Sequence, residues 1–306
     1  MYKIFIDGSA GTTGLRIYER LESRKDIELI KLSEENRKNP DARKDALQSA
    51  DIAFLCLPDA AAIEAVGLAG DADTVIIDTS TAHRVNDDWA YGFPEIGSLR
   101  EKIASSKRIA NPGCHASGFI SLVAPLTEKG IIPKNALLSC YSLTGYSGGG
   151  KKMIAQYDDE GRDVFLESPG MYGLTQSHKH LPEMSKICSL ENSPIFCPVV
   201  APYYSGMEVT VPLFAKEING TMQDIEEIYK SYYKTPLVSF KEGSENGFLY
   251  ANSLSGKDNM EITVCGNDER ILLVSRFDNL GKGASGAAIQ NMNIVMGLNE
   301  AEGLNI

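Results

Sequence analysis

The amino-terminal third of the chain alternates short, continuously apolar runs with segments that carry hydrophobic residues at helical spacing. The apolar runs predict strands at residues 2–7, 27–32, 51–57 and 74–78. Helical spacing follows residue 14 and is found again at about residues 42–48 and 60–69. Apolar strands that alternate with helices are typical of a parallel sheet covered by helices on both faces. This α/β pattern is the first expectation for the fold.

The pattern changes beyond residue 113, where strand-like runs follow one another with few helices between them. These runs lie at residues 137–143, 195–200, 207–213, 261–264 and 271–277, with one clear helix at about 222–232. We expect an inserted α+β domain with a mainly antiparallel sheet. A last helix, to about residue 298, would pack Ala288, Met292, Val295 and Met296 against the first domain. The predicted domains are therefore 1–112 with 283–306, and 113–282.

A glycine-rich turn directly follows the first predicted strand and precedes a predicted helix. Its glycines at positions 8, 11 and 14 suit a tight turn, close approach of a pyrophosphate, and close packing of helix on strand. This favours dinucleotide binding over a plain turn. After the second strand, Ser33 and Arg37 suit the 2′-phosphate of NADP, whereas Glu34 and Glu35 suit NAD or a solvated charged turn.

Ligands of parallel sheets bind beyond the carboxyl ends of the strands, and several polar loops are expected at that edge. The turn at residues 8–14, the loops after residues 57 and 78, and the loop that leads to Cys114 would share it. Small residues at the start of the last helix also permit close approach of backbone, cofactor or sheet. The predicted NADP(H)-binding residues are Gly8, Ser9, Gly11, Thr12, Thr13, Gly14, Ser33, Arg37, Ser80 and Gly283.

Cys114 lies between a strand-like run at residues 108–110 and a helix-like run at residues 119–124. It is therefore expected at a helix amino terminus, where backbone N–H groups and the helix dipole favour a thiolate. The alternative is a buried structural cysteine beside a turn. The shared edge with the predicted dinucleotide site favours a nucleophile.

Two further segments carry candidate chemistry. His178 and His180 precede Glu183, which suits a proton shuttle oriented by a carboxylate, although a polar turn is an alternative. The segment 147–152, with three glycines and two lysines, indicates either a cationic anion-binding loop or a plain surface loop. We expect no metal site. Candidate substrate-binding residues are Arg84, Ser147, Lys151 and His178.

Composition narrows the class of protein. The chain has 306 residues, is 43% hydrophobic, and carries a formal net charge of −11, which argues against nucleic acid or an anionic membrane as partner. No apolar run approaches the length of a membrane span, and the first residues indicate a strand in place of a signal peptide. Six dispersed cysteines without a C-x-x-C pair favour a reduced cytoplasm.

Taken together, these motifs resemble the N-acetyl-gamma-glutamyl-phosphate reductases, and more closely the shorter, second type of that family. The resemblance is carried, in order and over nearly the whole chain, by residues 7–14, 78–84, 91–95, 111–114, 147–152, 178–183 and 281–286. One departure is His115, because an aromatic residue such as Tyr is common after the cysteine in the family.

The resemblance implies a Rossmann-like cofactor domain and a catalytic and oligomerisation domain, in a homodimer or homotetramer. It implies NADPH-dependent reduction of N-acetyl-glutamyl 5-phosphate to the 5-semialdehyde through a cysteine thioester, a step of arginine biosynthesis. The family's nucleophile falls on Cys114, its histidine base on His180 and its supporting glutamate on Glu183.

Other functions fit parts of the same pattern. The nearest alternative is a related acyl-phosphate reductase, such as an aspartate-semialdehyde dehydrogenase or a lysine-pathway homologue, but the residues around Cys114 and the run at residues 178–183 fit the glutamyl enzyme better. A non-catalytic NADP sensor would have no need of Cys114, His180 and Glu183 together. A cysteine hydrolase would leave the glycine turn unexplained.

Overall fold

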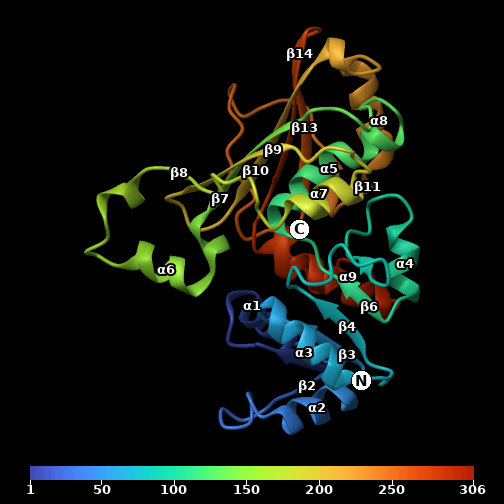
Figure 1. The fold of residues 1–306 in the computed structure, drawn as a ribbon, viewed down its shortest axis with the longest axis vertical. Helices are drawn as coiled ribbons and strands as arrows, with labels where there is room; N and C mark the ends of the chain where they lie inside the picture. The colour runs from blue at the N-terminus through green and yellow to red at the C-terminus, as the bar shows by residue number, and fades with distance from the viewer. The chain divides into compact units, whose positions relative to one another are not determined.

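The computed structural model describes residues 1–306, and the chain divides into two compact units (Figure 1). Unit 1 comprises Met1–Pro112 and Ala284–Leu304, and unit 2 comprises Gly113–Gly283 and Asn305–Ile306. The predicted division differs from these bounds at Gly283 and at the last two residues. The functions assigned to the two parts remain proposals.

Unit 1 is built on a six-stranded sheet with the strand order β2-β1-β3-β4-β6-β5, in which every pair is parallel. Its strands are β1 (Tyr2–Asp7), β2 (Ile27–Ile30), β3 (Ile52–Leu55), β4 (Val75–Asp78), β5 (Ala90–Tyr91) and β6 (Arg108–Ala110). The parallel sheet that the sequence predicts is confirmed. Because all strands run the same way, the loops after β1, β3, β4 and β6 emerge at one edge.

Helices cover both faces of this sheet, as its apolar strands require. They are α1 (Thr12–Leu21), α2 (Pro40–Ser49), α3 (Asp59–Ala69), α4 (Leu99–Ser105) and α9 (Gly286–Val295). Adjacent strand residues point to opposite faces, so Ile4 joins the core under α1 and α9, and Phe5 joins the core under α2 and α3. The predicted return of the last helix is confirmed, because Ala288 and Met292 are buried in the Ile4 core.

Unit 2 contains an eight-stranded sheet with the order β11-β12-β13-β14-β10-β7-β9-β8. The strands are β7 (Ser139–Gly145), β8 (Gly170–Met171), β9 (Ile195–Ala201), β10 (Met207–Phe214), β11 (Lys234–Thr235), β12 (Val238–Phe240), β13 (Met260–Gly266) and β14 (Arg270–Phe277). Only the pairs β7–β9 and β12–β13 are parallel. The predicted mainly antiparallel sheet is therefore confirmed.

The helices of unit 2 are α5 (Cys114–Glu128), α6 (Gly150–Asp158), α7 (Leu181–Ile187) and α8 (Met222–Tyr232). Helix α5 is apolar and buried over nearly its whole length, and it packs on β10 and β14. Gly118 permits this approach, since a Cβ there would lie 2.3 Å from a methyl carbon of Val209. None of the helices combines the length and the hydrophobicity that a membrane crossing requires.

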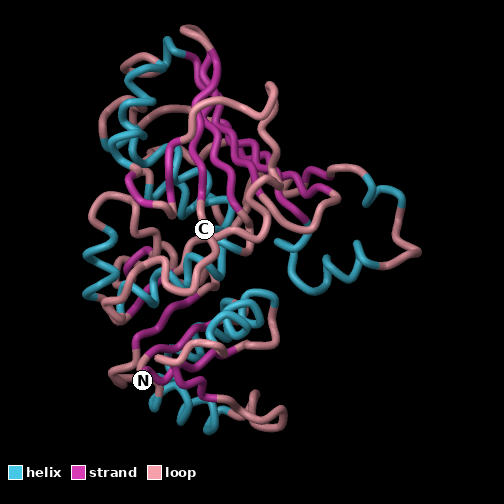
Figure 2. Tube along the Cα trace, turned by 180° about the vertical axis from the view of Figure 1, so that it is seen from behind, coloured by secondary structure: helices cyan, strands magenta, loops and turns pink.

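An arm (residues 146–169) extends from the sheet of unit 2 between β7 and β8 in the sequence (Figures 1 and 2). It holds α6 and two 3₁₀ turns, Tyr146–Gly149 and Val164–Glu167. The prediction of an irregular loop at residues 147–152 is wrong. Gly150, at φ +73°, forms the corner between the first 3₁₀ turn and α6, so Lys151 and Lys152 lie exposed in the first turn of a helix.

Candidate active site

Cys114 is the first residue of α5, as the sequence predicts. The preceding Gly113 has extended backbone angles, φ −79° and ψ 145°, and no side chain caps the helix. Helix α5 carries no acidic residue of its own in the first turn, and the carboxylate of Glu183 on α7, which reaches this end, is held by the backbone N–H of Gly113. This end of α5 therefore favours the thiolate form of the half-buried Cys114.

Gly283 packs directly against this cysteine. A Cβ at Gly283 would lie 3.0 Å from the Cβ of Cys114 and 3.2 Å from the ring of Phe277, so a larger residue would push the turn away. Asp278 fixes the same turn, because its Oδ1 accepts hydrogen bonds from the backbone N–H groups of Leu280 and Gly281. Gly283 is predicted from the sequence, whereas Asp278, a buried acid that directly follows β14, is not. Cofactor binding by Gly283 remains a prediction.

Glu183 joins the segment before Cys114 to His180. It lies in the first turn of α7, is 1% exposed, and accepts a hydrogen bond of 3.2 Å at Oε2 from the backbone N–H of Gly113. Its Oε1 lies 3.9 Å from Nε2 of His180, the residue that precedes α7. The structure thus brings together the three predicted catalytic residues within unit 2, and their roles remain predictions.

His115, the departure from the family pattern, lies at the centre of a buried aromatic cluster. Its Nδ1 is 2.6 Å from Oγ of Ser142 on β7, and its Nε2 is 2.6 Å from the hydroxyl of Tyr172. The ring centroids of His178, His180 and Phe196 lie 5.8, 5.5 and 5.3 Å from that of His115. Burial, followed by the nearby His178, lowers the pKa of His115 from 6.5 to about 3. His115 is therefore neutral near pH 7.

This low pKa predicts that His115 makes the fold sensitive to acid. The unfolded chain takes up a proton below pH 6.5, whereas the folded chain does not until about pH 3, so stability is lost as pH falls through this window. Between about pH 7 and about pH 5 the loss from this residue is about 2 kcal/mol. His115→Phe removes that contribution, and urea unfolding at the two pH values measures it.

Each protein serves as its own reference in this comparison, because the substitution also changes stability at neutral pH. Burial also lowers the pKa of His178, but that residue is present in both proteins. The wild type should therefore lose more stability on acidification than His115→Phe. Equal losses in the two proteins would show that His115 does not titrate as described.

The predicted substrate-binding residues of unit 2 lie in different settings. The hydroxyl of Ser147 is fully buried and accepts a hydrogen bond of 3.0 Å from the side-chain amide of Asn279. His178 belongs to the aromatic cluster, with its ring centroid 4.7 Å from that of His180. Lys151 is exposed on α6. Substrate binding by these residues remains a prediction.

Unit 1 contains a cavity of about 380 Å³ at the glycine turn. Gly8 and Ser9 line it, together with Tyr18 of α1. Gly8 has φ +86°, and a Cβ there would lie 2.3 Å from the carbonyl oxygen of Cys56. At Gly14, a Cβ would lie 2.4 Å from the carbonyl oxygen of Gly8. Only glycine fits these two positions, which place the turn against α1 beside the cavity.

Three cations, Lys31, Arg37 and Lys38, line this cavity together with two acids. The carboxylate of Glu34 is 2.9 Å from Arg37, and that of Asp7 is 3.0 Å from Arg43, so both acids are paired with an arginine. A dinucleotide with a 2′-phosphate fits this composition, because the side chains offer positive charge beside a cavity of nucleotide size. Ser33, predicted from the sequence, is not among the lining residues. The predicted residues Gly11, Thr12, Thr13 and Gly14 form the end of the turn and the start of α1.

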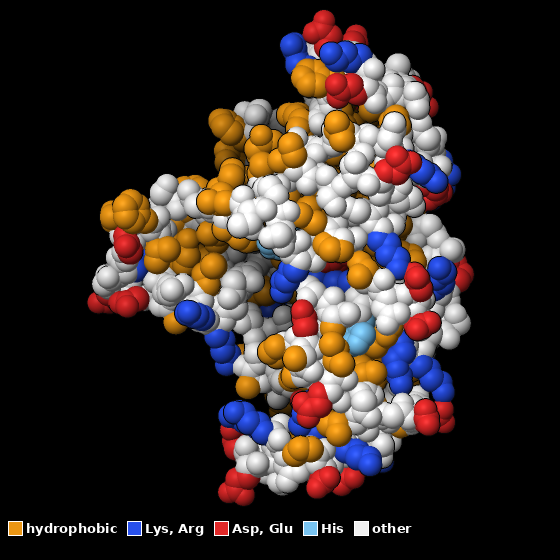
Figure 3. All heavy atoms as spheres, viewed as in Figure 1, with side chains coloured by type: hydrophobic (Ala, Val, Ile, Leu, Met, Phe, Trp, Pro, Cys, Tyr) orange, Lys and Arg blue, Asp and Glu red, His pale blue; other side chains and the backbone are white.

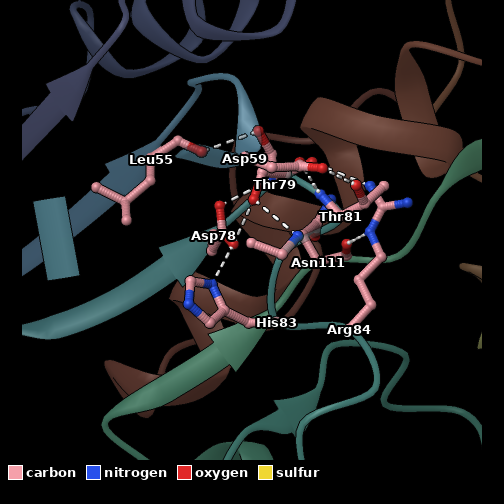
Figure 4. A network of polar contacts seen from close by, with 10 residues as sticks. Leu55, Asp59, Asp78, Thr79, Thr81, His83, Arg84 and Asn111 are labelled. Carbon is pink, nitrogen blue, oxygen red and sulfur yellow. Dashed lines mark hydrogen bonds and ion pairs between the residues drawn. The ribbon is translucent and has the colours of Figure 1, made fainter. Parts of the chain in front are cut away.

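Ser80 and Arg84 take part in a network at the carboxyl end of β4 (Figure 4). Asp78, fully buried, accepts from the backbone N–H and the hydroxyl of Ser80 and lies 2.7 Å from Nδ1 of His83. Arg84 donates to the backbone carbonyls of Asn111 and Thr79. Ser80 and Arg84 therefore join loops within unit 1. Cofactor binding by Ser80 and substrate binding by Arg84 remain predictions.

All six cysteines are free thiols, and no group of three or more His, Cys, Asp or Glu residues is arranged to hold a metal ion. Burial raises the pKa of Cys56 to about 12 and also raises the pKa values of Cys140 and Cys188. These three thiols are therefore unsuited to act as thiolates near pH 7.

The sequence matches two family descriptions. Residues 3–106 match "Semialdehyde dehydrogenase, NAD binding domain", and residues 114–279 match "Semialdehyde dehydrogenase, dimerisation domain". Curated relatives from Brucella ovis and Brucella canis, named N-acetyl-gamma-glutamyl-phosphate reductase, are 45% identical to it over 96% of this chain and 99% of theirs.

Solved structures show the same fold at low sequence identity. Aspartate semialdehyde dehydrogenase II from Vibrio cholerae, in complex with ASA, has a TM-score of 0.72 at 15% identity over 97% of this chain and 98% of that chain. The enzyme from Candida albicans with NADP has a TM-score of 0.68 at 13% identity over 97% and 99%. At these identities the likeness is evidence for the fold alone.

Proposed function

The chain belongs to the N-acetyl-gamma-glutamyl-phosphate reductases of the semialdehyde dehydrogenase family, and on this premise we propose that it reduces N-acetyl-glutamyl 5-phosphate to N-acetyl-glutamate 5-semialdehyde and phosphate. NADPH is the reductant, and the reaction is a step of arginine biosynthesis in the cytoplasm. The observation that carries the proposal is Cys114 at the start of α5, with its neighbour Gly113 bound to Glu183 and Glu183 facing His180.

The proposed reaction begins at the sulfur of Cys114. The thiolate attacks the acyl carbon, a C–S bond forms, and the carbonyl electron pair moves to oxygen. Collapse of this oxyanion breaks the bond to the phosphate oxygen, so phosphate leaves and a thioester remains on Cys114. His180 holds and returns the proton of the thiol, and Glu183 orients His180. When bound, NADPH supplies the hydride that reduces the thioester to the aldehyde.

The cavity beside Gly8 is the proposed cofactor site, and Arg37 is its proposed partner for the 2′-phosphate. Arg37→Ala should weaken NADP⁺ binding about 10-fold while changing NAD⁺ binding by less than about 2-fold, because only NADP⁺ carries the phosphate. Isothermal titration calorimetry with each nucleotide measures both affinities. An equal loss of affinity for the two nucleotides would contradict this role. Arg20→Ala, in the last turn of α1, is the control.

The substrate is tested in the reverse direction, because acyl phosphates are labile. N-acetyl-glutamate 5-semialdehyde, phosphate and NADP⁺ are supplied, and NADPH is followed by its absorbance. The proposal predicts phosphate-dependent NADPH formation, with aspartate semialdehyde a poor substitute. Turnover of aspartate semialdehyde alone would transfer the assignment to the related acyl-phosphate reductases. If folded protein that binds NADP⁺ turns over neither semialdehyde, a non-catalytic NADP sensor would be favoured.

We also propose that unit 2 forms a homo-oligomer through the face of its sheet that lies opposite α5. The strand register places Tyr141, Ile195, Phe214 and Leu272 on this face, and all four are exposed. Figure 3 shows hydrophobic side chains gathered over the arm and the adjoining strands. An apolar surface spread over neighbouring strands is typical of an interface between subunits.

Leu272→Asp should disrupt this assembly, because it places a charge where an apolar side chain would be buried against a partner. We expect the dissociation constant to rise at least about 100-fold, since an unpaired buried charge costs about 3 kcal/mol or more. Sedimentation equilibrium measures the change. Ile63→Asp, at an exposed position of α3 in unit 1, is the matched control and should leave the assembly intact. Equal masses for wild type and Leu272→Asp would contradict the proposed interface.

A further inference from the structure

Ser142, His115 and Tyr172 form a chain of hydrogen bonds that runs from the buried Ser142, through the residue after the proposed nucleophile, to the partly exposed Tyr172. Ser142 is fully buried on β7, His115 is 3% exposed and directly follows Cys114 on α5, and Tyr172 directly follows β8. The backbone N–H of Tyr172 donates to the carbonyl of Pro198 on β9, which fixes the backbone of this residue. Three separate elements therefore converge on His115.

The partners of Ser142 determine which way these hydrogen bonds run. The hydroxyl of Ser142 makes its only hydrogen bond to Nδ1 of His115, and a buried hydroxyl proton without an acceptor is costly. Ser142 therefore donates to Nδ1. A neutral imidazole has one donor and one acceptor nitrogen, so Nε2–H must donate to the oxygen of Tyr172. The proton of the Tyr172 hydroxyl is then available to a further acceptor.

Cys114 directly precedes His115 on α5, and Nε2 of His115 lies 2.6 Å from this hydroxyl. Burial raises the pKa of Tyr172, and the charge of Cys114 raises it further. The tyrosine therefore stays protonated near pH 7 and acts as a donor. Its side chain is 36% exposed, so one side remains open while His115 holds the other. The acceptor that develops close to Cys114 during acylation is the oxyanion on the carbon bonded to its sulfur.

We propose that the hydroxyl of Tyr172 donates a hydrogen bond to the acyl oxygen of the substrate during attack by Cys114, and that His115 and Ser142 are positioning residues for this donor. The inference rests on the proposed acyl-phosphate chemistry. It assigns to Tyr172 a catalytic role in stabilising the oxyanion, and it gives a use to the histidine that replaces the family's aromatic residue.

The test measures acylation without the cofactor, as a rapid release of one equivalent of phosphate from N-acetyl-glutamyl 5-phosphate. Tyr172→Phe removes only the hydroxyl and should slow this release about 100-fold, which is the effect of losing one oxyanion donor. Alkylation of Cys114 by iodoacetamide should change less than about 2-fold, because it forms no oxyanion. Tyr250→Phe, at an exposed tyrosine, is the matched control. Unchanged release, or equal slowing of release and alkylation, would overturn the proposal.

His115 is tested through its coupling to Tyr172. His115→Phe keeps an aromatic ring in the cluster but cannot donate, so it should slow phosphate release about 10-fold in the wild-type background. It should have almost no further effect in Tyr172→Phe, and His115→Gln, which retains an amide donor, should restore part of the rate. Additive losses and no rescue by Gln would show a merely structural role for His115.

A second acyl phosphate separates this inference from the proposed substrate. If the wild type releases phosphate from acetyl phosphate or β-aspartyl phosphate but not from N-acetyl-glutamyl 5-phosphate, the substrate assignment fails. The effect of Tyr172→Phe on the reactive compound then decides the inference. If no acyl phosphate acylates Cys114, both proposals fail.

Discussion

Cys114→Ser is expected to lower phosphate-dependent NADPH formation from N-acetyl-glutamate 5-semialdehyde by about 10⁴-fold or more. The helix amino terminus favours a thiolate at Cys114, but it is too weak to ionise a serine hydroxyl, whose pKa is far higher. The reaction would therefore lose its nucleophile while the fold and the cofactor cavity in unit 1 remain. Initial rates measure the loss, and nucleotide titration verifies that NADP⁺ still binds.

Cys265→Ser is the matched control for this substitution. Cys265 is a half-buried thiol on β13, and burial raises its pKa, so it is no candidate for a thiolate. Its replacement should leave the rate within about 2-fold of wild type, as expected for a substitution away from the site. If Cys114→Ser keeps a tenth or more of the activity, another residue must be the nucleophile.

His180→Gln is expected to lower kcat about 10³-fold, because the proton of the thiol would lose its positioned acceptor. The glutamine has a similar reach and is compatible with the end of the loop before α7, so the change is chemical more than structural. The pH dependence of kcat/KM should lose the limb that reports His180. A full pH profile with kcat near the wild-type value would contradict a proton shuttle at this position.

Glu183→Gln tests whether the carboxylate acts through His180. The glutamine oxygen still accepts from the backbone N–H of Gly113, whereas the charge that faces Nε2 of His180 is lost. Because the two side chains act as a unit, the double variant should be little slower than His180→Gln alone. Losses that add for the pair would indicate independent roles.

The features that the sequence predicts are those with local signals. The apolar strands, the turn at Gly8 and the helix start at Cys114 follow from neighbouring residues, and the structure confirms each of them. The start of α7 is also locally marked, because Pro182 suits the first turn of a helix and sets Glu183 close behind His180.

The features that the sequence did not reveal depend on contacts between distant segments. Ser142 and Tyr172 reach His115 only because β7, β8 and β9 lie side by side in one sheet, and no spacing in the sequence encodes that pairing. Ser33 is predicted to bind the 2′-phosphate because the predicted second strand extends to residue 32. Strand β2 ends at Ile30, and Lys31 already lines the cavity.

An acyl group carried on Cys114 can be detected by mass spectrometry of the protein after it is mixed with N-acetyl-glutamyl 5-phosphate in the absence of NADPH and quenched in acid. We expect one N-acetyl-glutamyl group per chain, on the peptide that contains Cys114, and we expect hydroxylamine to release it as it releases a thioester. An unmodified Cys114 peptide in protein that turns over the substrate, or an acyl group on another residue, would contradict this role of Cys114.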